Sequence, residues 1–105
     1  KNNALNSAVA LAGLAVTAGA GAIVCSPLEI AAIRAAVGTA PIIITPGVRP
    51  ADSSSADDQV RTMTPKAAID SGANFVVIGR PITQRWSSGA SGMRERAAEI
   101  AGELI

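Results

Sequence analysis

Three short runs of apolar, mostly β-branched residues recur along the chain, at residues 22–25, 42–45 and 75–78. None of them alternates between apolar and polar residues, which is typical of parallel strands that are buried on both faces. Each run is followed by a turn signal and then by a helical pattern. Strands that alternate with helices indicate a parallel sheet with right-handed crossovers, so the sequence predicts an α/β fold.

The helices of these repeats carry recognisable start and stop signals. Asn3 is placed to cap a helix whose apolar residues share one face as far as Val16, before the glycines that follow. The run Ser26-Pro27-Leu28-Glu29 predicts a capping box with proline at the first helical position. Thr64-Pro65 opens a third helix by the same logic, and Gly72 ends it.

The C-terminal part is predicted to hold a further helix start near Pro81, a flexible loop and a final amphipathic helix. The Ser- and Gly-rich residues 87–92 are interpreted as the loop, and residues 93–104 as the helix. On that helix Ile100 and Leu104 are expected to face inward. Its charged residues are expected to face mostly outward: Arg94, Arg96, Glu99 and Glu103.

An open doubly wound sheet would share this βα pattern, and the position of the polar residues favours a barrel. Ser26-Pro27, Pro46-Gly47 and Gly79-Arg80 all stand at the carboxyl ends of the predicted strands. Barrel active sites lie at that face, and phosphate commonly binds after strands seven and eight. A complete (β/α)8 barrel needs about 200 residues or more. The 105-residue chain is therefore predicted to be a single incomplete domain, residues 1–105, comprising about strands 6–8 of a TIM barrel with their helices.

Composition excludes several classes of function. The net charge of +1 and the aromatic content of 2% argue against a nucleic-acid interface. One cysteine and no histidine exclude a zinc site of the usual Cys/His type and an intrachain disulfide, which fits a cytoplasmic protein. Without a histidine to activate it, Cys25 is expected to be a small buried residue. The apolar residues 8–23 are too short and glycine-interrupted for a membrane span.

Two segments could bind an anion. A glycine at a strand end, as at Gly79, allows close backbone approach, and Arg80 beside it could add a charge-assisted clamp. The alternative is a turn glycine with a surface arginine. Arg49 and Gln59 lie on a long polar loop that runs to about Arg61, where Gln59 could bridge a phosphate and a heterocycle; a solvated loop is the alternative.

Taken together, these blocks resemble one family. The strings Thr45-Pro46-Gly47-Val48-Arg49-Pro50, Asp58-Gln59-Val60-Arg61, Thr64-Pro65 and Val77-Ile78-Gly79-Arg80-Pro81-Ile82-Thr83 resemble the C-terminal region of bacterial-type orotidine 5′-phosphate decarboxylases. Residues 24–29 resemble the family's sixth strand and the helix after it. The resemblance covers nearly the whole chain, with the blocks in the expected order.

The resemblance implies a role for each of five residues. Arg80 resembles the phosphate-binding arginine of the family, and Gly79 offers its backbone beside it. Gln59 resembles the glutamine that contacts both phosphate and pyrimidine. Arg49 resembles the loop arginine of the nucleotide site, and Pro46 would line the pocket near the base. The implied reaction is the decarboxylation of orotidine 5′-monophosphate (OMP) to uridine 5′-monophosphate (UMP), without a cofactor, by an enzyme that is homodimeric at full length.

Two departures from the family pattern matter. The catalytic Asp-x-Lys-x-x-Asp motif does not occur in the chain, so no catalytic residue is expected here. Arg85-Trp86-Ser87-Ser88-Gly89 also differs from the usual short Asp-Pro lead into the last helix. The alternatives are a non-catalytic phosphate-binding half-barrel fragment, or another phosphate-binding barrel such as a sugar-phosphate lyase or isomerase. The Asp58-Gln59 loop and the Thr-Pro-Gly-Val-Arg string favour the decarboxylase.

Overall fold

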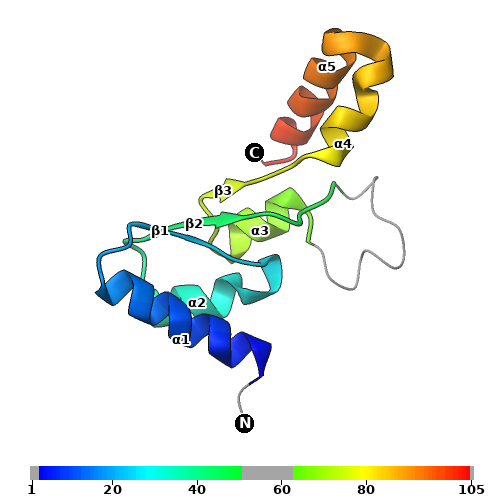
Figure 1. Ribbon diagram of the computed structural model, residues 1–105. Helices are drawn as coiled ribbons and strands as arrows, with labels where there is room; N and C mark the ends of the chain where they lie inside the picture. Colours follow the sequence, from blue (N-terminus) through cyan, green and yellow to red (C-terminus); the bar gives the residue numbers. More distant parts are fainter. Residues whose placement is uncertain (1–2, 51–62, 105) are drawn as a thin grey trace.

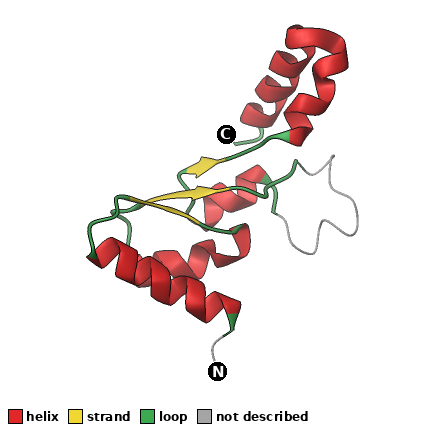
Figure 2. Cartoon of the chain, in the orientation of Figure 1, coloured by secondary structure: helices red, strands yellow, loops and turns green. Residues whose placement is uncertain are grey.

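A three-stranded parallel sheet forms the centre of the computed structural model, which describes residues 3–50 and 63–104 (Figures 1 and 2). The strands are β1 (Ala22–Val24), β2 (Ile42–Thr45) and β3 (Phe75–Val76), in that spatial order. Both pairings are parallel. The predicted α/β class and the parallel sheet are therefore confirmed.

Helices cover one face of this sheet. They are α1 (Ala4–Thr17), the short 3-10 helix η1 (Pro27–Glu29), α2 (Ile30–Val37) and α3 (Pro65–Ser71). α1 and α2 lie side by side beneath the strands (Figure 1). The start signals are confirmed, because Asn3 and Thr64 cap α1 and α3, and Ser26 forms a complete capping box. Ile30, Ile33 and Ile43 are buried where the helices meet the sheet.

The opposite face of the sheet is apolar and largely open. Its residues belong to one side of the pleat, because Val24 pairs with Ile44 and Ile44 with Phe75. Val24 is 69% exposed, Phe75 59% and Val77 52%. A parallel sheet normally has both faces covered. This sheet therefore presents a hydrophobic face for which the described residues provide no second layer.

β3 is shorter than residues 75–78 because its partner strand ends early. Val77 still donates its N–H to the Thr45 carbonyl at 2.9 Å, so the pairing runs one residue beyond β3. Pro46, which follows β2, has no N–H to donate. Gly47 then takes a positive φ of 77°, which turns the chain away from the sheet. The residues after Val77 consequently have no ladder to join on β2.

The C-terminal residues form a helical hairpin that stands away from the sheet (Figure 1). It comprises α4 (Arg80–Thr83), the 3-10 helix η4 (Gln84–Ser88) and α5 (Gly89–Gly102), and α5 packs on η4 and α4. The prediction of a flexible loop over residues 87–92 is wrong. Gly89, with a φ of 77°, makes the turn between η4 and α5. A Cβ at Gly92 would lie 2.5 Å from the Ser88 Cβ, so the small residues allow close packing.

The outward orientation predicted for Arg96 is also wrong. Its side chain is 3% exposed and donates from Nη1 to the Glu99 Oε2 at 2.9 Å. Arg96 precedes the buried Ile100 by one turn, so the two residues share the inner face of α5. The other charged residues of this helix, Arg94, Glu99 and Glu103, are exposed as expected.

Arg34 joins the loops at the amino-terminal ends of β2 and β3. Its Nη1 donates to the carbonyls of Gly38 and Pro41, at 3.0 and 2.6 Å. Its Nη2 donates to the Gly72 carbonyl at 2.7 Å and to the Asn74 Oδ1 at 2.9 Å. The same Oδ1 accepts the N–H of Ile43 at 2.8 Å, which connects this network to β2.

Candidate functional site

The candidate site is the edge of the sheet at which all three strands end. Since the strands are parallel, their carboxyl ends lie at the same edge. Ser26 and Pro46 follow β1 and β2 there, and Gly79 comes after β3. This is the edge at which ligand residues gather in α/β folds.

Gly79 and Arg80 connect β3 to the helical hairpin. Gly79 precedes α4, and its carbonyl accepts the N–H groups of Ile82 and Thr83, both at 3.0 Å. Arg80 is exposed, and its guanidinium makes no hydrogen bond or ion pair with any residue that the structure describes. A charged group with its donors open to solvent is available for an anion.

Pro46 and Arg49 lie beyond β2. Pro46 is exposed and Arg49 is half-buried. The backbone between them is held because Val48 forms a parallel bridge with Met63, and the Arg49 N–H donates to the Met63 carbonyl at 2.9 Å. Gln59 lies outside the described residues, so its predicted convergence with Arg80 on one pocket stays a prediction.

The end of β1 is held by two local contacts. Ser26 donates its N–H to the Glu29 Oε1 at 3.1 Å and accepts the Leu28 N–H at its own Oγ. The buried Thr45 donates from Oγ1 to the Cys25 carbonyl at 2.7 Å, which fixes the ends of β1 and β2 to each other. Sequence reasoning missed this role of Thr45. The available signal was a single hydroxyl residue at the end of an isoleucine run, directly before a proline.

Cys25 is buried, as expected, and is poorly suited to act as a nucleophile. Burial raises the pKa of its thiol, and the nearby Glu29 carboxylate raises it further, while Arg34 acts in the opposite direction. The protonated thiol is the unreactive form. Within residues 3–50 and 63–104, no three His, Cys, Asp or Glu side chains are grouped so that they could hold a metal ion.

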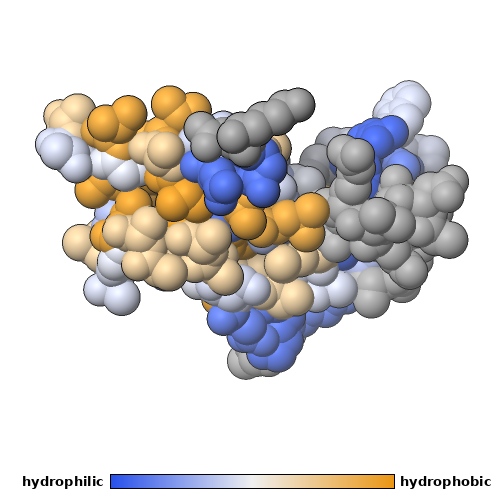
Figure 3. Space-filling model, turned by 90° about the horizontal axis from the view of Figure 1, so that it is seen from below, coloured by the Kyte–Doolittle hydropathy of each residue, from blue (hydrophilic) through white to orange (hydrophobic). Residues whose placement is uncertain are grey.

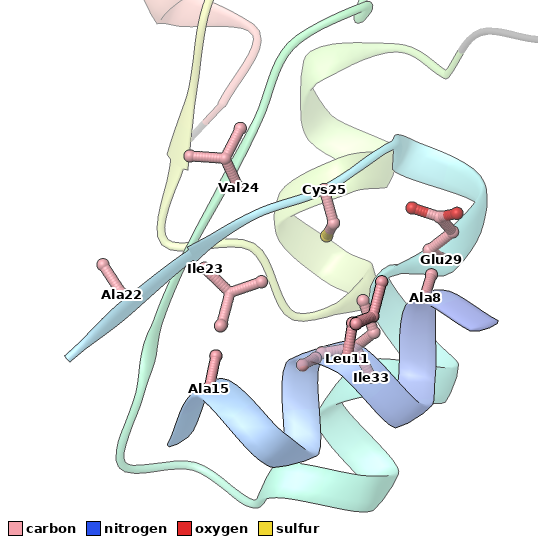
Figure 4. A pocket seen from close by; sticks show the side chains of 10 residues that line it. Ala8, Leu11, Ala15, Ala22, Ile23, Val24, Cys25, Glu29 and Ile33 are labelled. Carbon is pink, nitrogen blue, oxygen red and sulfur yellow. The ribbon is translucent and has the colours of Figure 1, made fainter. Parts of the chain in front are cut away.

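A groove of about 350 Å³ lies elsewhere, between α1 and β1 (Figure 4). Apart from Glu29, a charged residue at one end, its lining side chains are uncharged and mostly apolar, among them Ala8, Leu11, Ala15 and Ile23. Neither Gly79 nor Arg80 lines it. The groove therefore has the wrong chemistry for a phosphate and is separate from the candidate anion site.

The parallel βα units and the ligand-type residues at their carboxyl ends define an α/β protein with a candidate phosphate site. The family model for "Orotidine 5'-phosphate decarboxylase / HUMPS family" matches residues 3–92. The chain belongs to this family, which confirms the family predicted from the sequence.

Individual relatives of this chain are named as members of the same family. An orotidine 5′-phosphate decarboxylase of Anaeromyxobacter dehalogenans is 57% identical over 74 residues, covering 70% of this chain and 32% of the relative. One from Thermobifida fusca is 53% identical over 94 residues, covering 90% of this chain and 38% of the relative. A crystal structure of the Lactobacillus acidophilus enzyme matches with a TM-score of 0.72 and 33% identity, covering 98% of this chain and 40% of that one. The chain thus spans about a third of the length of these curated relatives.

Proposed function

We propose that this chain is the nucleotide-binding part of an orotidine 5′-phosphate decarboxylase, a carboxy-lyase that converts OMP to UMP and CO2 without a cofactor. Family membership supports the reaction. The observation that carries the binding role is the position of Arg80. It follows the third parallel strand at the sheet's carboxyl edge, with its guanidinium exposed and unpaired among the described residues.

The same proposal assigns the fold of the complete protein. Residues 1–105 are a single incomplete domain, about strands 6–8 of a (β/α)8 barrel with their helices. Two features support this assignment. Helices cover only one face of the parallel sheet, as they do on the outside of a barrel, and the other face is apolar, as the packed interior of a barrel requires.

Each site residue receives a role in binding the nucleotide. Arg80 binds the phosphate, and Gly79 leaves room for the anion beside the backbone. Gln59 bridges the phosphate and the pyrimidine, Arg49 contributes to the nucleotide site, and Pro46 lines the pocket near the base. The exposed positions of Pro46, Gly79 and Arg80 after neighbouring strands are compatible with one shared ligand.

The chemistry of decarboxylation is assigned to the rest of the polypeptide. The sequence contains no Asp-x-Lys-x-x-Asp motif, so a catalytic Asp/Lys network must come from outside this segment. We propose a cytoplasmic homodimer for the complete enzyme, with no nucleic-acid or membrane partner. None of the helices in the described part of the chain combines the length and apolar character needed to cross a membrane.

A full-length chimera tests the binding role. In it, this segment replaces the matching region of the Thermobifida fusca relative, which aligns with 90% of the chain. Arg80→Ala removes a charge-assisted contact worth about 1.5–3 kcal/mol, so UMP affinity should fall about tenfold to a hundredfold. Affinity for uridine, which lacks the phosphate, should barely change. Both values come from titration calorimetry.

Arg94→Ala is the matched control, because Arg94 is an exposed arginine on α5, away from the sheet edge. It should leave both affinities unchanged. Equal losses for UMP and uridine in Arg80→Ala would show that Arg80 supports the fold and does not bind phosphate.

A further inference from the structure

Two short segments lie next to each other beyond the carboxyl end of β2. Residues 46–50 follow β2, and residues 63–65 lead into α3. Val48 forms a parallel bridge with Met63, so the two segments run side by side (Figure 1). Residues 47–50 and 63–65 are called the stem below. Arg49, which is assigned to the nucleotide site above, belongs to this stem.

The stem is firmly anchored, although it lies outside the regular strands. The two neighbours of Arg49 are buried: Val48 is 3% exposed and belongs to the main core, and Pro50 is fully buried. Gly47 takes a positive φ of 77°, and a Cβ at this position would lie 3.8 Å from the Pro27 Cδ, so the turn contacts η1. Buried residues on both sides of Arg49 leave its backbone little freedom to move.

Met63 joins the backbone of Arg49 to α3. The Arg49 N–H donates to the Met63 carbonyl at 2.9 Å. The Met63 side chain is half-buried and packs against the core, and its sulfur lies 4.0 Å from the Ser71 Oγ at the end of α3. Methionine is a side chain that adapts its shape to fill such an irregular space. Met63 therefore contacts α3 through its side chain and Arg49 through its carbonyl.

We infer that Met63 is a positioning residue for the nucleotide site and that it acts through Arg49. The inference rests on the proposed function, in which Arg49 contributes to that site. A fixed backbone limits the positions that the guanidinium of Arg49 can reach, so less conformational entropy is lost when it binds an anion. Met63 itself is not expected to touch the nucleotide, because its carbonyl already accepts the Arg49 N–H.

Amide hydrogen exchange in the chimera without nucleotide tests the link between the two backbones. Met63→Ala removes the side chain that packs on α3, and it should speed the exchange of the Arg49 amide on the order of tenfold. Met63→Leu nearly keeps the volume and should leave the exchange rate close to that of the wild type. If the Arg49 amide exchanged equally fast in the wild type and in Met63→Ala, the inference would be overturned.

A double-mutant cycle on UMP binding tests whether Met63 acts through Arg49. Met63→Ala alone should weaken UMP binding about threefold to thirtyfold, as titration calorimetry would measure. In the Arg49→Ala background the same change should cause no further loss, because the side chain that Met63 positions is already absent. Met63→Leu should retain the wild-type affinity. Equal losses in the two backgrounds would mean that Met63 acts without Arg49 and would overturn the inference.

Val37→Ala is the control for a general loss of packing. Val37 is half-buried against the same core, and it ends α2 on the amino-terminal side of β2, away from the stem. It belongs to the layer of α1 and α2, whose lower surface is mostly hydrophobic and unsuited to a phosphate (Figure 3). Val37→Ala should lower the thermal midpoint of the chimera and leave UMP affinity and the exchange of the Arg49 amide unchanged. A loss of UMP affinity as large as that in Met63→Ala would reduce the effect of Met63 to one on stability and would overturn the inference.

Failure of the proposed function would give a different pattern. UMP would fail to bind, or it would bind independently of Arg49 and Arg80. The Arg49 amide would still exchange faster in Met63→Ala, because that measurement needs no nucleotide. The link between the two backbones would then stand, and the positioning role of Met63 would fall together with the nucleotide site.

Discussion

The two ends of the parallel sheet use arginine in opposite ways. At the amino-terminal end, Arg34 donates to four acceptors and holds the loops before β2 and β3 together. At the carboxyl end, the guanidinium of Arg80 is exposed and meets no partner among the described residues. Both side chains carry the same charge and the same planar set of donors. The difference lies in whether the fold itself supplies the acceptors.

This difference separates stability from binding within a small structure. A guanidinium whose donors are satisfied by backbone carbonyls contributes to the fold and has little left to offer a ligand. A guanidinium without protein acceptors contributes little to stability and is available for an anion. In barrels, the amino-terminal face is the stability face and the carboxyl face is the functional one. The predictions that follow alter one end at a time.

The largest effect should be the absence of catalysis in the isolated 105-residue chain. Its carboxyl edge carries the proposed binding residues, while the sequence lacks the Asp-x-Lys-x-x-Asp motif. We expect no decarboxylation of OMP, because a phosphate-binding site alone supplies no proton donor. A steady-state assay of the isolated polypeptide measures this, with the chimera as the positive control. Turnover by the isolated chain above the blank would contradict the division between binding and chemistry.

Loss of the Arg34 network should give the largest change in stability. Arg34→Ala leaves the carbonyls of Pro41 and Gly72 and the Asn74 side chain without their donor. The free energy of unfolding of the chimera should fall by about 2–4 kcal/mol. Urea unfolding measures it. Arg34→Lys should recover only part of the loss, because the ammonium group of lysine lacks the planar set of N–H donors of a guanidinium.

Arg80→Ala is the matched change at the other end of the sheet. It should alter the free energy of unfolding by less than about 0.5 kcal/mol, since the side chain is exposed and unpaired among the described residues. If Arg34→Ala and Arg80→Ala destabilised the chimera equally, the contrast between the two ends would not hold.

Sequence reasoning recovered the elements better than the contacts between them. The three strands and the helix starts were predictable because β-branched runs, Ser-Pro and Thr-Pro are local signals. The Arg34 network was not, since it joins residues up to 40 positions apart. Arg96 was misplaced because an amphipathic pattern assigns every charge to solvent, whereas its side chain is 3% exposed on the same face of α5 as Ile100. Gly89 and Gly92 were interpreted as loop residues, although Gly89 takes the positive φ of the turn into α5 and Gly92 packs closely on Ser88.

The candidate site was predicted one residue at a time. The positions of Pro46, Gly79 and Arg80 after parallel strands follow from the proline and glycine residues that end the apolar runs in the sequence. The convergence of Gln59 with Arg80 depends on a long loop and stays a prediction, because Gln59 lies outside the described residues. Thr45 was overlooked, since a hydroxyl that donates to a carbonyl of the neighbouring strand leaves no mark in a short window of sequence.

Thr45 provides the next test, because it is a buried polar contact at the carboxyl end. Thr45→Val removes the 2.7 Å hydrogen bond to the Cys25 carbonyl at nearly constant volume. The free energy of unfolding of the chimera should fall by about 1–2 kcal/mol, as urea unfolding would show. Thr45→Ser should retain most of the stability. Thr39→Val, at an exposed position, should change it by less than about 0.5 kcal/mol. Equal losses in Thr45→Val and Thr39→Val would remove the structural role given to Thr45.

The smallest expected effect is a pH dependence that arises from Cys25. Burial raises the pKa of this thiol in the folded state, with a further contribution from Glu29. The folded protein therefore holds the proton more tightly than the unfolded chain, in which the cysteine thiol has a pKa of about 8.5. The resulting stability is fully present below that pH and is lost as the pH rises through the raised pKa of the folded state.

Urea unfolding of the chimera at pH 7 and in alkaline buffer should show this loss. The Cys25→Ala variant serves as the reference, because other groups of the chimera titrate equally in both proteins. The wild-type chimera should lose more stability than Cys25→Ala between the two conditions. The same slope in both would mean that Cys25 is open to solvent in the complete protein.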